Sequence, residues 1–425
     1  MQASIYNFLL HSSRGNIFLV NPLYNTIIRL EPWLLELFSK KPVRFFEKRH
    51  PDFYACLLRN KFIVEDGDDE IQICVAKVLD RLETNGGQLQ LTINPTLDCN
   101  LRCWYCYEEH RQGSRMSAET VLAVLRHIER KIRERKWNAL HLSFFGGEPL
   151  LGFETVIIPI LAKTKDLCDR EHVKFSHGYT SNATLITPKR LNELRAISPN
   201  IHFQIPFDGS ESNHNKVKHF ANGRGCYSKV LETTRMLIQN GVSVTIRCNV
   251  TNENVNSFSD LVNAFSDLST HKNFSFQIQK VWQERNTESL KKGILCLSSL
   301  IKKNGLQSNL NNGDAGYRCA RCYADYRHNI VINYDGNVFQ CTARDFTKNN
   351  RMGMLQADGE ILYNDAFISR RFAQIKEECV TCRILPICPL CSQRKYETDE
   401  MKCALKHDDH VIKQNLKGHF KIESL

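Results

Sequence analysis

Three closely spaced cysteines give this sequence its clearest chemical signal. Cys99, Cys103 and Cys106 form the pattern Cys-x3-Cys-x2-Cys, directly after the strand-like run Leu89–Ile93. Cysteine thiolates hold iron–sulfur clusters, and a four-iron cube has four corners to ligate. Three thiolates leave one iron without a protein ligand. We therefore expect an open iron that binds a substrate or cofactor and transfers an electron to it.

A single zinc ion is the alternative for clustered cysteines. Structural zinc sites use four ligands, commonly arranged as two pairs. The pattern at positions 99–106 supplies three cysteines and has no fourth ligand nearby. The ligand count and spacing therefore favour iron–sulfur over zinc.

The composition is that of a globular protein. The 425 residues are enough for two or three domains, and 42% of them are hydrophobic and 24% charged. The start, MQASIYNFLLHSSRGN, lacks the basic region of a secretory signal, and no apolar run reaches the roughly 18 residues of a membrane span. We expect no membrane partner and a cytoplasmic location, where clustered cysteines favour metal over disulfides.

The formal net charge of +11 raises the possibility of a nucleic-acid partner. Basic residues are spread along the chain, however, and segments such as RHIERKIRER at 126–135 also carry acids. No nucleic-acid reader motif accompanies them. We expect no nucleic-acid partner; an acidic electron donor or a peptide would use the same basic surface.

The chain is predicted to have three segments. Residues 1–86 form a small α/β unit that ends at the turn Asn85-Gly86-Gly87, and residues 311–425 are cysteine-rich and organised by metal. In residues 87–310, strands and helices alternate. The predicted strands are Leu89–Ile93, His141–Phe145, Lys174–Tyr179, Ile201–Phe207, Val244–Val250 and Phe274–Val281. The predicted helices are Ala118–Arg133, Thr155–Leu167, Pro188–Arg195, Lys229–Gln239 and Ser257–Leu268. Such an array is an open barrel or a doubly wound sheet, with its site at the carboxyl ends of the strands.

Tyr105, just before the third cysteine, completes a strand–loop–helix pattern that resembles the signature of the radical S-adenosylmethionine (SAM) superfamily. The resemblance implies an α/β fold with a partial (β/α)6 TIM-like barrel. It also implies that Cys99, Cys103 and Cys106 hold a SAM-binding [4Fe-4S] cluster. Reductive cleavage of SAM would then give a 5′-deoxyadenosyl radical that takes a hydrogen atom from an unreactive C–H bond, while the protein orients and shields the cofactors.

Two further segments match the superfamily after the second and third strands. The glycines of Gly146-Gly147-Glu148-Pro149 allow close backbone approach, and the resemblance implies that Glu148 binds the amino group of SAM. Taken alone, the segment would be an ordinary turn. Ser181 and Asn182 are candidates for the ribose or carboxylate of SAM, with an Asx-type turn as the alternative.

Two charged residues mark the fourth and fifth strands. Asp208 faces a ligand or the substrate, or it only shapes its loop. Arg247 binds the carboxylate of SAM, or it forms a structural ion pair with a barrel acid. The candidate cofactor contacts are Tyr105, Gly146, Gly147, Glu148, Ser181, Asn182 and Arg247, and Asp208 is the candidate catalytic residue. The lone cysteines are expected to be small buried residues: Cys56, Cys74, Cys168, Cys226, Cys248 and Cys296.

The C-terminal segment carries a second group of cysteines. They are Cys319, Cys322, Cys341, Cys379, Cys382, Cys388, Cys391 and Cys403. Eight thiolates match two clusters with four cysteine ligands each. The pattern resembles the SPASM extension, which implies one auxiliary [4Fe-4S] cluster on Cys319, Cys322, Cys341 and Cys391. It implies a second on Cys379, Cys382, Cys388 and Cys403. A pair of zinc knuckles is the alternative.

The resemblance also implies a class of substrate. SPASM-bearing enzymes mostly modify peptides or proteins. Residues 1–86 resemble a winged-helix-like domain that binds a leader peptide by strand addition, and a plain packing cap on the barrel is the alternative. We expect maturation of a ribosomally made precursor peptide or protein, for example by a thioether or carbon–carbon cross-link, with flavodoxin or ferredoxin as electron donor. The alternatives are sulfatase-maturase-like oxidation of Ser or Cys to formylglycine, weakened by Thr342 where those maturases have Asp, and a non-catalytic zinc scaffold.

Overall fold

The structure is a computed structural model that describes residues 1–106, 108, 110–134, 136–310, 321–388, 390–397, 403 and 409–424. Contacts divide the chain into two compact units. The first joins Met1–Asn85, Asn312–Tyr326 and Ile368–Leu425, and the second joins Gly86–Asn311 and Arg327–Phe367. Each unit combines segments that are far apart in the sequence. The division into 1–86, 87–310 and 311–425 remains a prediction.

A ten-stranded sheet forms the centre of the second unit. Its six parallel strands are β6 (Gln88–Ile93), β7 (Ala139–Phe144), β8 (Lys174–Thr180), β9 (Ile201–Phe207), β10 (Ser243–Val250) and β11 (Phe274–Lys280). Each strand pairs with the next one in the sequence. A doubly wound sheet would reverse its strand order part-way. The unbroken order confirms the predicted partial barrel.

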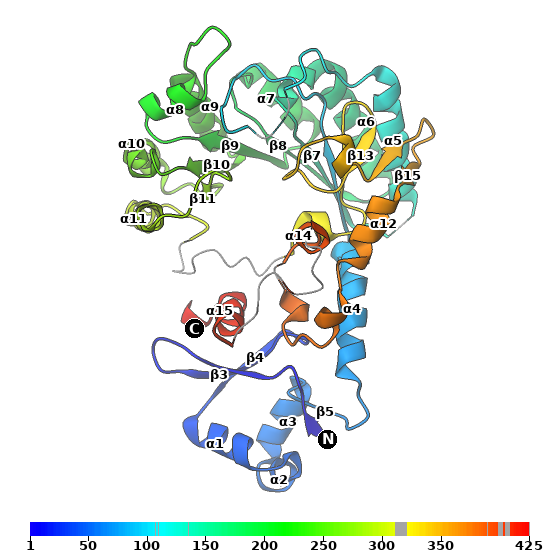
Figure 1. Ribbon diagram of the computed structural model, residues 1–425, viewed down its shortest axis with the longest axis vertical. Helices are drawn as coiled ribbons and strands as arrows, with labels where there is room; N and C mark the ends of the chain where they lie inside the picture. Colours follow the sequence, from blue (N-terminus) through cyan, green and yellow to red (C-terminus); the bar gives the residue numbers. More distant parts are fainter. Residues whose placement is uncertain are drawn as a thin grey trace. The chain divides into compact units, whose positions relative to one another are not determined.

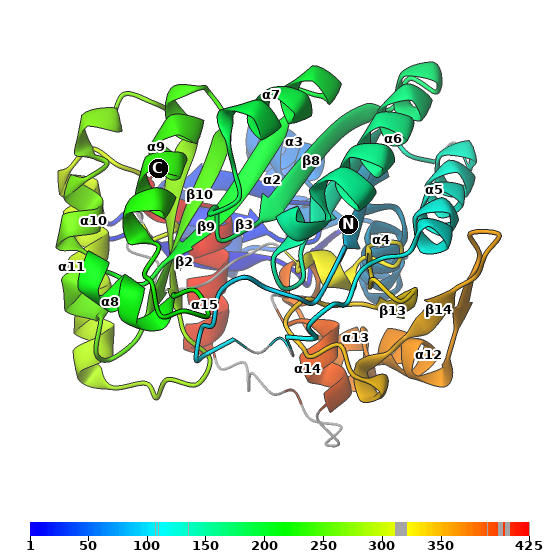
Figure 2. The same ribbon diagram turned by 90° about the horizontal axis from the view of Figure 1, so that it is seen from above.

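Helices lie along the outer side of this curved array (Figure 2). They are α5 (Ala118–Arg133), α6 (Ile158–Arg170), α7 (Pro188–Ile197), α9 (Tyr227–Gln239), α10 (Ser259–Asn263) and α11 (Glu288–Lys303), and the short α8 (Glu211–Val217) follows β9. The prediction of one helix over Ser257–Leu268 is wrong, because only α10 is α-helical there. The hydroxyl groups of Ser257 and Ser266 bond to backbone carbonyls three residues earlier, in competition with the helix.

The two faces of the parallel strands differ in polarity. Leu142, Phe203 and Ile246 are fully buried and pack in one apolar core with the helices. Alternate residues such as Gln204 and Arg247 are only partly buried. Because side chains alternate along a strand, the barrel has an apolar outer layer and a polar inner face. This polar face is where charged cofactors and substrates can be held.

Four short strands extend the same sheet beyond β6. They are β12 (Ile330–Ile332), β13 (Asn337–Phe339), β14 (Gly353–Leu355) and β15 (Ile361–Tyr363). β12 pairs with β6 in parallel, and the remaining pairs are antiparallel. Each strand has three residues, too few for a periodic hydrophobic pattern. Their sequence therefore gives no strand signal.

The first unit contains the N-terminal helices and strands, shown in blue in Figure 1. β1 (Gln2–Ala3) pairs with β5 (Ile63–Val64), and β2 (Phe8–His11), β3 (Ile17–Asn21) and β4 (Thr26–Leu30) form a three-stranded antiparallel sheet. The helices are α1 (Pro32–Lys40), α2 (Val43–Arg49), α3 (Pro51–Arg59), α4 (Glu70–Thr84), α13 (Glu377–Val380), α14 (Ser392–Glu397) and α15 (Asp409–His419). A further helix, α12 (Asp365–Phe372), spans the boundary between the units.

The core of the first unit joins the two ends of the chain. Phe8 and Leu10 pack in one buried cluster with Ile384 and Leu416. In a second cluster, Cys74 of α4 packs with Cys379 and Leu385. The N-terminal segment is therefore packed against the cysteine-rich segment. It also has a core of its own, formed by Leu19, Leu30, Leu57, Phe62 and Ile63.

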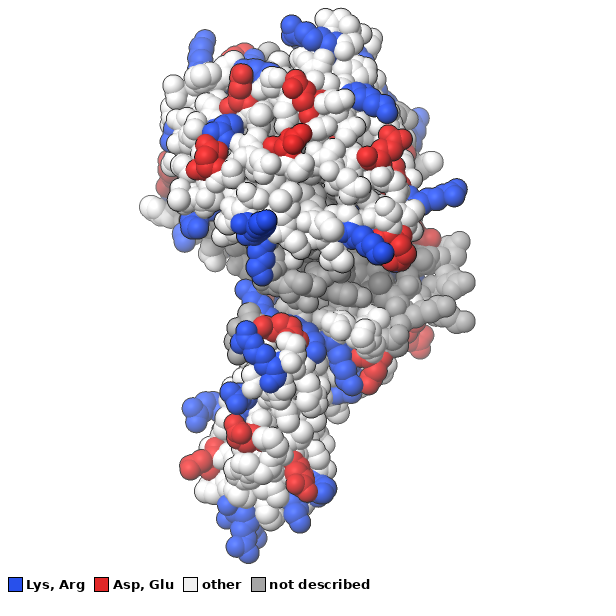
Figure 3. All heavy atoms as spheres, turned by 90° about the vertical axis from the view of Figure 1, so that its left-hand side faces the viewer, with Lys and Arg blue, Asp and Glu red and all other residues white. Residues whose placement is uncertain are grey.

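The surface carries charges of both signs. On the face drawn in Figure 3, basic and acidic side chains lie interspersed. None of the helices in the described part of the chain is long and apolar enough to cross a membrane.

Candidate active site

The cysteine loop that follows β6 is held by the loop that follows β7. The backbone N–H of Gly147 donates to Thr96 O at 3.1 Å, and that of Glu148 donates to Asp98 O at 2.8 Å. A Cβ on Gly146 would lie 2.3 Å from Thr96 O, and one on Gly147 would lie 2.2 Å from Asp98 O. Only glycine permits this approach. The two glycines thus fix the backbone that leads into Cys99.

Glu148 is fully buried where these two loops contact each other. Its Oε1 accepts bonds from Leu150 N at 3.1 Å and Ser181 Oγ at 2.9 Å, and its Oε2 accepts one from Asn182 N at 2.8 Å. Burial raises its pKa to about 7, and these donors oppose the shift. Because a carboxylate oxygen has two lone pairs, Oε2 keeps one for a further donor.

Asn182 links the loop after β8 to the cysteine loop. Its amide Nδ2 donates to Asn100 Oδ1 at 2.8 Å and lies 3.9 Å from Cys99 Sγ. Its Oδ1 accepts from Thr184 N at 3.0 Å, which is the Asx-type turn expected as the alternative. Asn182 therefore shapes its own loop and contacts a candidate cluster ligand at the same time.

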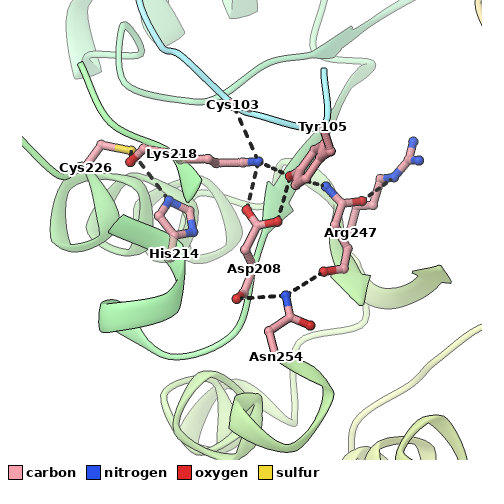
Figure 4. Close-up of polar contacts among 9 residues, drawn as sticks. Cys103, Tyr105, Asp208, His214, Lys218, Cys226, Arg247 and Asn254 are labelled. Atoms are coloured by element: carbon pink, nitrogen blue, oxygen red, sulfur yellow. Dashed lines mark hydrogen bonds and ion pairs between the residues drawn. The ribbon is translucent and has the colours of Figure 1, made fainter. Parts of the chain in front are cut away.

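The buried residues Asp208 and Lys218 and the partly buried Tyr105 form a polar group beside Cys103 (Figure 4). The Tyr105 hydroxyl donates to Asp208 Oδ1 at 2.6 Å and accepts a bond from Asn249 Nδ2 at 2.9 Å. The Lys218 ammonium lies 2.8 Å from Asp208 Oδ2, 3.9 Å from Cys103 Sγ and within hydrogen-bond distance of the Tyr105 hydroxyl. The charge of Asp208 is thus compensated by Lys218, which belongs to no recognised sequence motif.

Arg247 lies on β10 with its side chain partly buried. Its Nε donates to Asn249 Oδ1 at 3.0 Å. In the described part of the chain, no carboxylate lies within ion-pair distance of its guanidinium. The structural ion pair weighed as the alternative therefore does not form with any described residue.

The three thiols share one loop and influence one another. Burial raises the pKa of Cys99 to about 12 and that of Cys106 to about 11, and each is raised further by the charge on Cys103. Burial also raises the pKa of Cys103, whereas the Lys218 ammonium lowers it. Neutral thiols in this position need a cationic metal centre to ionise fully. The donor set suits a cluster held on three thiolates. Over the described residues, no three His, Cys, Asp or Glu side chains are arranged to hold a single metal ion.

A second group of thiols lines a hollow in the first unit. The lining includes Leu385 and Lys395 and all four cysteines assigned by resemblance to one auxiliary cluster: Cys379, Cys382, Cys388 and Cys403. Burial raises the pKa of Cys382 to about 11, and the charges of the other three thiols add to the shift. Lys395 Nζ lies 3.7 Å from Cys379 Sγ. The donor set suits a four-cysteine cluster.

The other auxiliary set is only partly described. Cys319 lies outside the described residues, and Cys341 belongs to the second unit. Within the first unit, the segments of Cys322 and Cys391 meet, because buried Asp325 accepts bonds from Ser392 N at 2.8 Å and Ser392 Oγ at 2.6 Å. The ligation of this set remains a prediction.

Two further residues, Lys218 and Asn249, complete the site, and the sequence gives no signal for their role. Lys218 is one of many lysines, and only the fold places its ammonium next to Asp208 and Cys103.

Among the lone cysteines, four are buried as expected, but Cys56 is partly buried and Cys296 is exposed.

Comparison with protein families matches residues 93–265 to the Radical SAM superfamily. The match runs from the last residue of β6 to just beyond α10 and so includes all three thiols of the cysteine loop. The chain carries a radical SAM domain. This domain makes it a radical SAM enzyme and implies a [4Fe-4S] cluster and SAM as cofactors.

Two known proteins are similar to this radical SAM enzyme, each over a different share of the chain. An uncharacterized protein of Methanocaldococcus jannaschii is 24% identical over 258 residues, which cover 60% of this chain and 85% of that protein. Radical SAM cyclopropyl synthase TigE of Paramaledivibacter caminithermalis is 26% identical over 182 residues, 37% of this chain and 38% of TigE. The chain thus spans most of the first relative and less than half of TigE.

A solved structure supports the fold. Native anSMEcpe with bound AdoMet and the Cp18Cys peptide has a TM-score of 0.55 to this chain at 19% identity. The likeness covers 79% of this chain and 96% of that one.

Proposed function

We propose that this radical SAM enzyme modifies a ribosomally made peptide or protein, for example by a thioether or carbon–carbon cross-link. One observation carries the proposal. At the carboxyl edge of the barrel sheet, the loop of Cys99, Cys103 and Cys106 is joined to Glu148 and Asn182 on one side. On the other side it reaches the buried Asp208 and Lys218.

In this proposal the three thiolates would hold the [4Fe-4S] cluster, and the polar inner face would receive SAM. When bound, the cluster would supply the electron for reductive cleavage of SAM to the hydrogen-abstracting 5′-deoxyadenosyl radical. Glu148 offers the free lone pair of Oε2 to the amino group of SAM, and Arg247, with no carboxylate partner among the described residues, is available for the SAM carboxylate. Tyr105 and Asn182 keep the cysteine loop in place. Asp208 is either a substrate contact or the counter-ion of Lys218.

Two further observations support a peptide substrate. The hollow lined by Cys379, Cys382, Cys388 and Cys403 suits an auxiliary cluster of the SPASM type, and such clusters accompany peptide modification. In the three-stranded sheet β2–β3–β4, the outer strands β2 and β4 pair with no further strand among the described residues, and an extended leader peptide can add a strand there. TigE is named a cyclopropyl synthase, and anSMEcpe was solved with a peptide. The net charge of +11 suits an acidic electron donor such as flavodoxin or ferredoxin.

Oxidation of Ser or Cys to formylglycine is the second candidate. The fold likeness to anSMEcpe with a bound peptide favours it, and Thr342, where such maturases place Asp after the cluster cysteine, counts against it. The non-catalytic zinc scaffold does not fit a chain that carries a radical SAM domain. Iron and sulfide analysis directly separates an iron–sulfur enzyme from a zinc scaffold.

The Cys103→Ala variant tests the proposed active site. Oxygen-free wild-type protein given SAM and dithionite should form 5′-deoxyadenosine, and the variant should form at least a hundredfold less because one corner of the cube loses its ligand. Cys296→Ala is the matched control, since Cys296 is an exposed cysteine on α11. Undiminished 5′-deoxyadenosine formation by Cys103→Ala would reject the site.

The substrate class needs a separate experiment. Co-production with short open reading frames encoded beside this one should change the mass of one peptide, with loss of hydrogen if a cross-link forms. A mass change that matches formylglycine would instead support the second candidate.

A further inference from the structure

The Lys218 ammonium is buried within reach of a candidate cluster ligand. Its side chain is 4% exposed, and its Nζ lies 3.9 Å from the sulfur of Cys103. Lys218 lies 115 residues beyond that cysteine in the sequence, so the contact is made by the fold alone. A buried lysine needs partners, and its neighbours supply them.

The ammonium forms an ion pair with Asp208 Oδ2 at 2.8 Å. It donates hydrogen bonds to the Tyr105 hydroxyl and to Cys103 Sγ. The Tyr105 hydroxyl donates its own hydrogen bond to Asp208 Oδ1 at 2.6 Å. The Lys218 ammonium is therefore held between the carboxylate, the hydroxyl and the sulfur.

The surrounding structure fixes the position of Lys218 (Figure 4). Lys218 caps α8, and its backbone N–H donates to His214 O at 2.6 Å. Its carbonyl accepts a bond from Cys226 Sγ at 3.4 Å, and Cys226 lies 3.5 Å from His214 Nε2. On the opposite side, Asn254 Nδ2 donates to Asp208 O at 3.1 Å. Hydrogen bonds thus fix the backbone of both charged residues, Lys218 and Asp208.

We propose that Lys218 is a positioning residue that hydrogen-bonds the cluster ligand Cys103, and that the Lys218–Asp208 pair sets the reduction potential of the SAM-binding cluster. The inference rests on the proposed function, because it requires a cluster on the three thiolates. Hydrogen bonds to the sulfurs and nearby charge are among the main determinants of iron–sulfur potentials. A cation at a ligand sulfur stabilises the added electron, and the Asp208 carboxylate opposes it.

A purely structural ion pair makes a different prediction. Loss of either partner would then lower stability and cluster content and leave the potential of the remaining clusters unchanged. Control of the potential by charge requires shifts of opposite sign for the two partners. This difference in sign separates the two roles.

The test is an EPR-monitored redox titration of oxygen-free, full-length protein, following the signal that changes when SAM is added. Lys218→Met should shift the reduction equilibrium of that cluster about tenfold toward the oxidised form, which is 59 mV for one electron. Asp208→Asn, which leaves the lysine without its counter-ion, should shift it in the other direction. Lys218→Arg should restore most of the wild-type value. Lys216→Met is the matched control, because the Lys216 side chain is 75% exposed.

Iron content is measured in the same samples. Lys218→Met with full iron and the wild-type potential would overturn the inference, as would shifts of the same sign in the two variants. If Lys218→Met does not fold, Asp208→Asn alone decides, since an unchanged or lowered potential there also overturns it. Failure of the wild-type protein to assemble a cluster on Cys99, Cys103 and Cys106 would instead contradict the proposed function.

Discussion

Single residues decide where the three thiols lie, at the place where the loop after β7 contacts the cysteine loop after β6. The sequence suggested that Gly146 and Gly147 allow close backbone approach, and the structure identifies the neighbours as Thr96 O and Asp98 O. These carbonyls lie three residues and one residue before Cys99. The glycines therefore act on the backbone of the cysteine loop. Direct contact of either glycine with SAM remains a prediction.

Gly147→Ala tests this role. The new Cβ would lie 2.2 Å from Asp98 O, so the cysteine loop must shift, and we expect a loss of stability of about 1–3 kcal/mol with loss of iron from the barrel site. Gly147 has no positive φ, so the effect is steric. Thermal unfolding and iron analysis measure it. Gly67→Ala, at an exposed position with open space around it, is the control, and equal behaviour of the two variants would refute the prediction.

At the scale of elements, α5 holds the turn between β14 and β15. His127 is 3% exposed, and its Nδ1 donates to Gly359 O at 2.9 Å. Its Nε2 is buried without a partner among the described residues. Burial lowers the pKa of His127 to about 4. The extension of the sheet therefore depends on a neutral imidazole.

Acid should release this turn. The unfolded state binds a proton near pH 6.5 and the folded state only near pH 4, so stability falls as the pH drops through that window. The full effect is about 3 kcal/mol at about 1.4 kcal/mol per pH unit. His127→Gln keeps a donor for Gly359 O but cannot titrate. The stability difference between wild type and this variant should be constant above pH 7 and should fall below it in thermal unfolding. A difference independent of pH from 7 to 4 would contradict the assignment.

At the scale of the whole chain, the first unit joins the two chain ends. Deletion of residues 1–86 would thus remove a peptide-binding sheet and also uncover the cysteine-rich segment, because Leu10 packs with Ile384 and Leu416. Deletion alone cannot separate substrate binding from support of the auxiliary site. Point substitutions in the shared core are the sharper test.

Leu10→Ala should destabilise the first unit by about 2–5 kcal/mol and weaken cluster retention at Cys379, Cys382, Cys388 and Cys403. If three four-iron clusters assemble, iron should fall from about twelve to about eight per chain while reductive SAM cleavage persists. Leu58→Ala is the matched control, since Leu58 is 37% exposed. Full iron content in Leu10→Ala would show that the N-terminal segment does not support this site.

The sequence by itself determined the features that depend on the spacing of residues along the chain. The Cys99–Cys106 loop, its position after β6, and the six strands of the barrel follow from local patterns, and β9 and α5 have the predicted bounds. Helical and strand periodicity and ligand spacing are local properties, so one segment is enough to reveal them.

Only the tertiary structure decided what lies beside those segments. It placed Lys218 at Cys103, paired β12 with β6, and packed the N-terminal segment against the cysteine-rich one. These contacts join residues more than a hundred positions apart, and each depends on burial and charge pairing that no local pattern records. A lysine in the sequence is ordinarily a solvated charge. The fold turned this one into a buried partner of a carboxylate and a thiol.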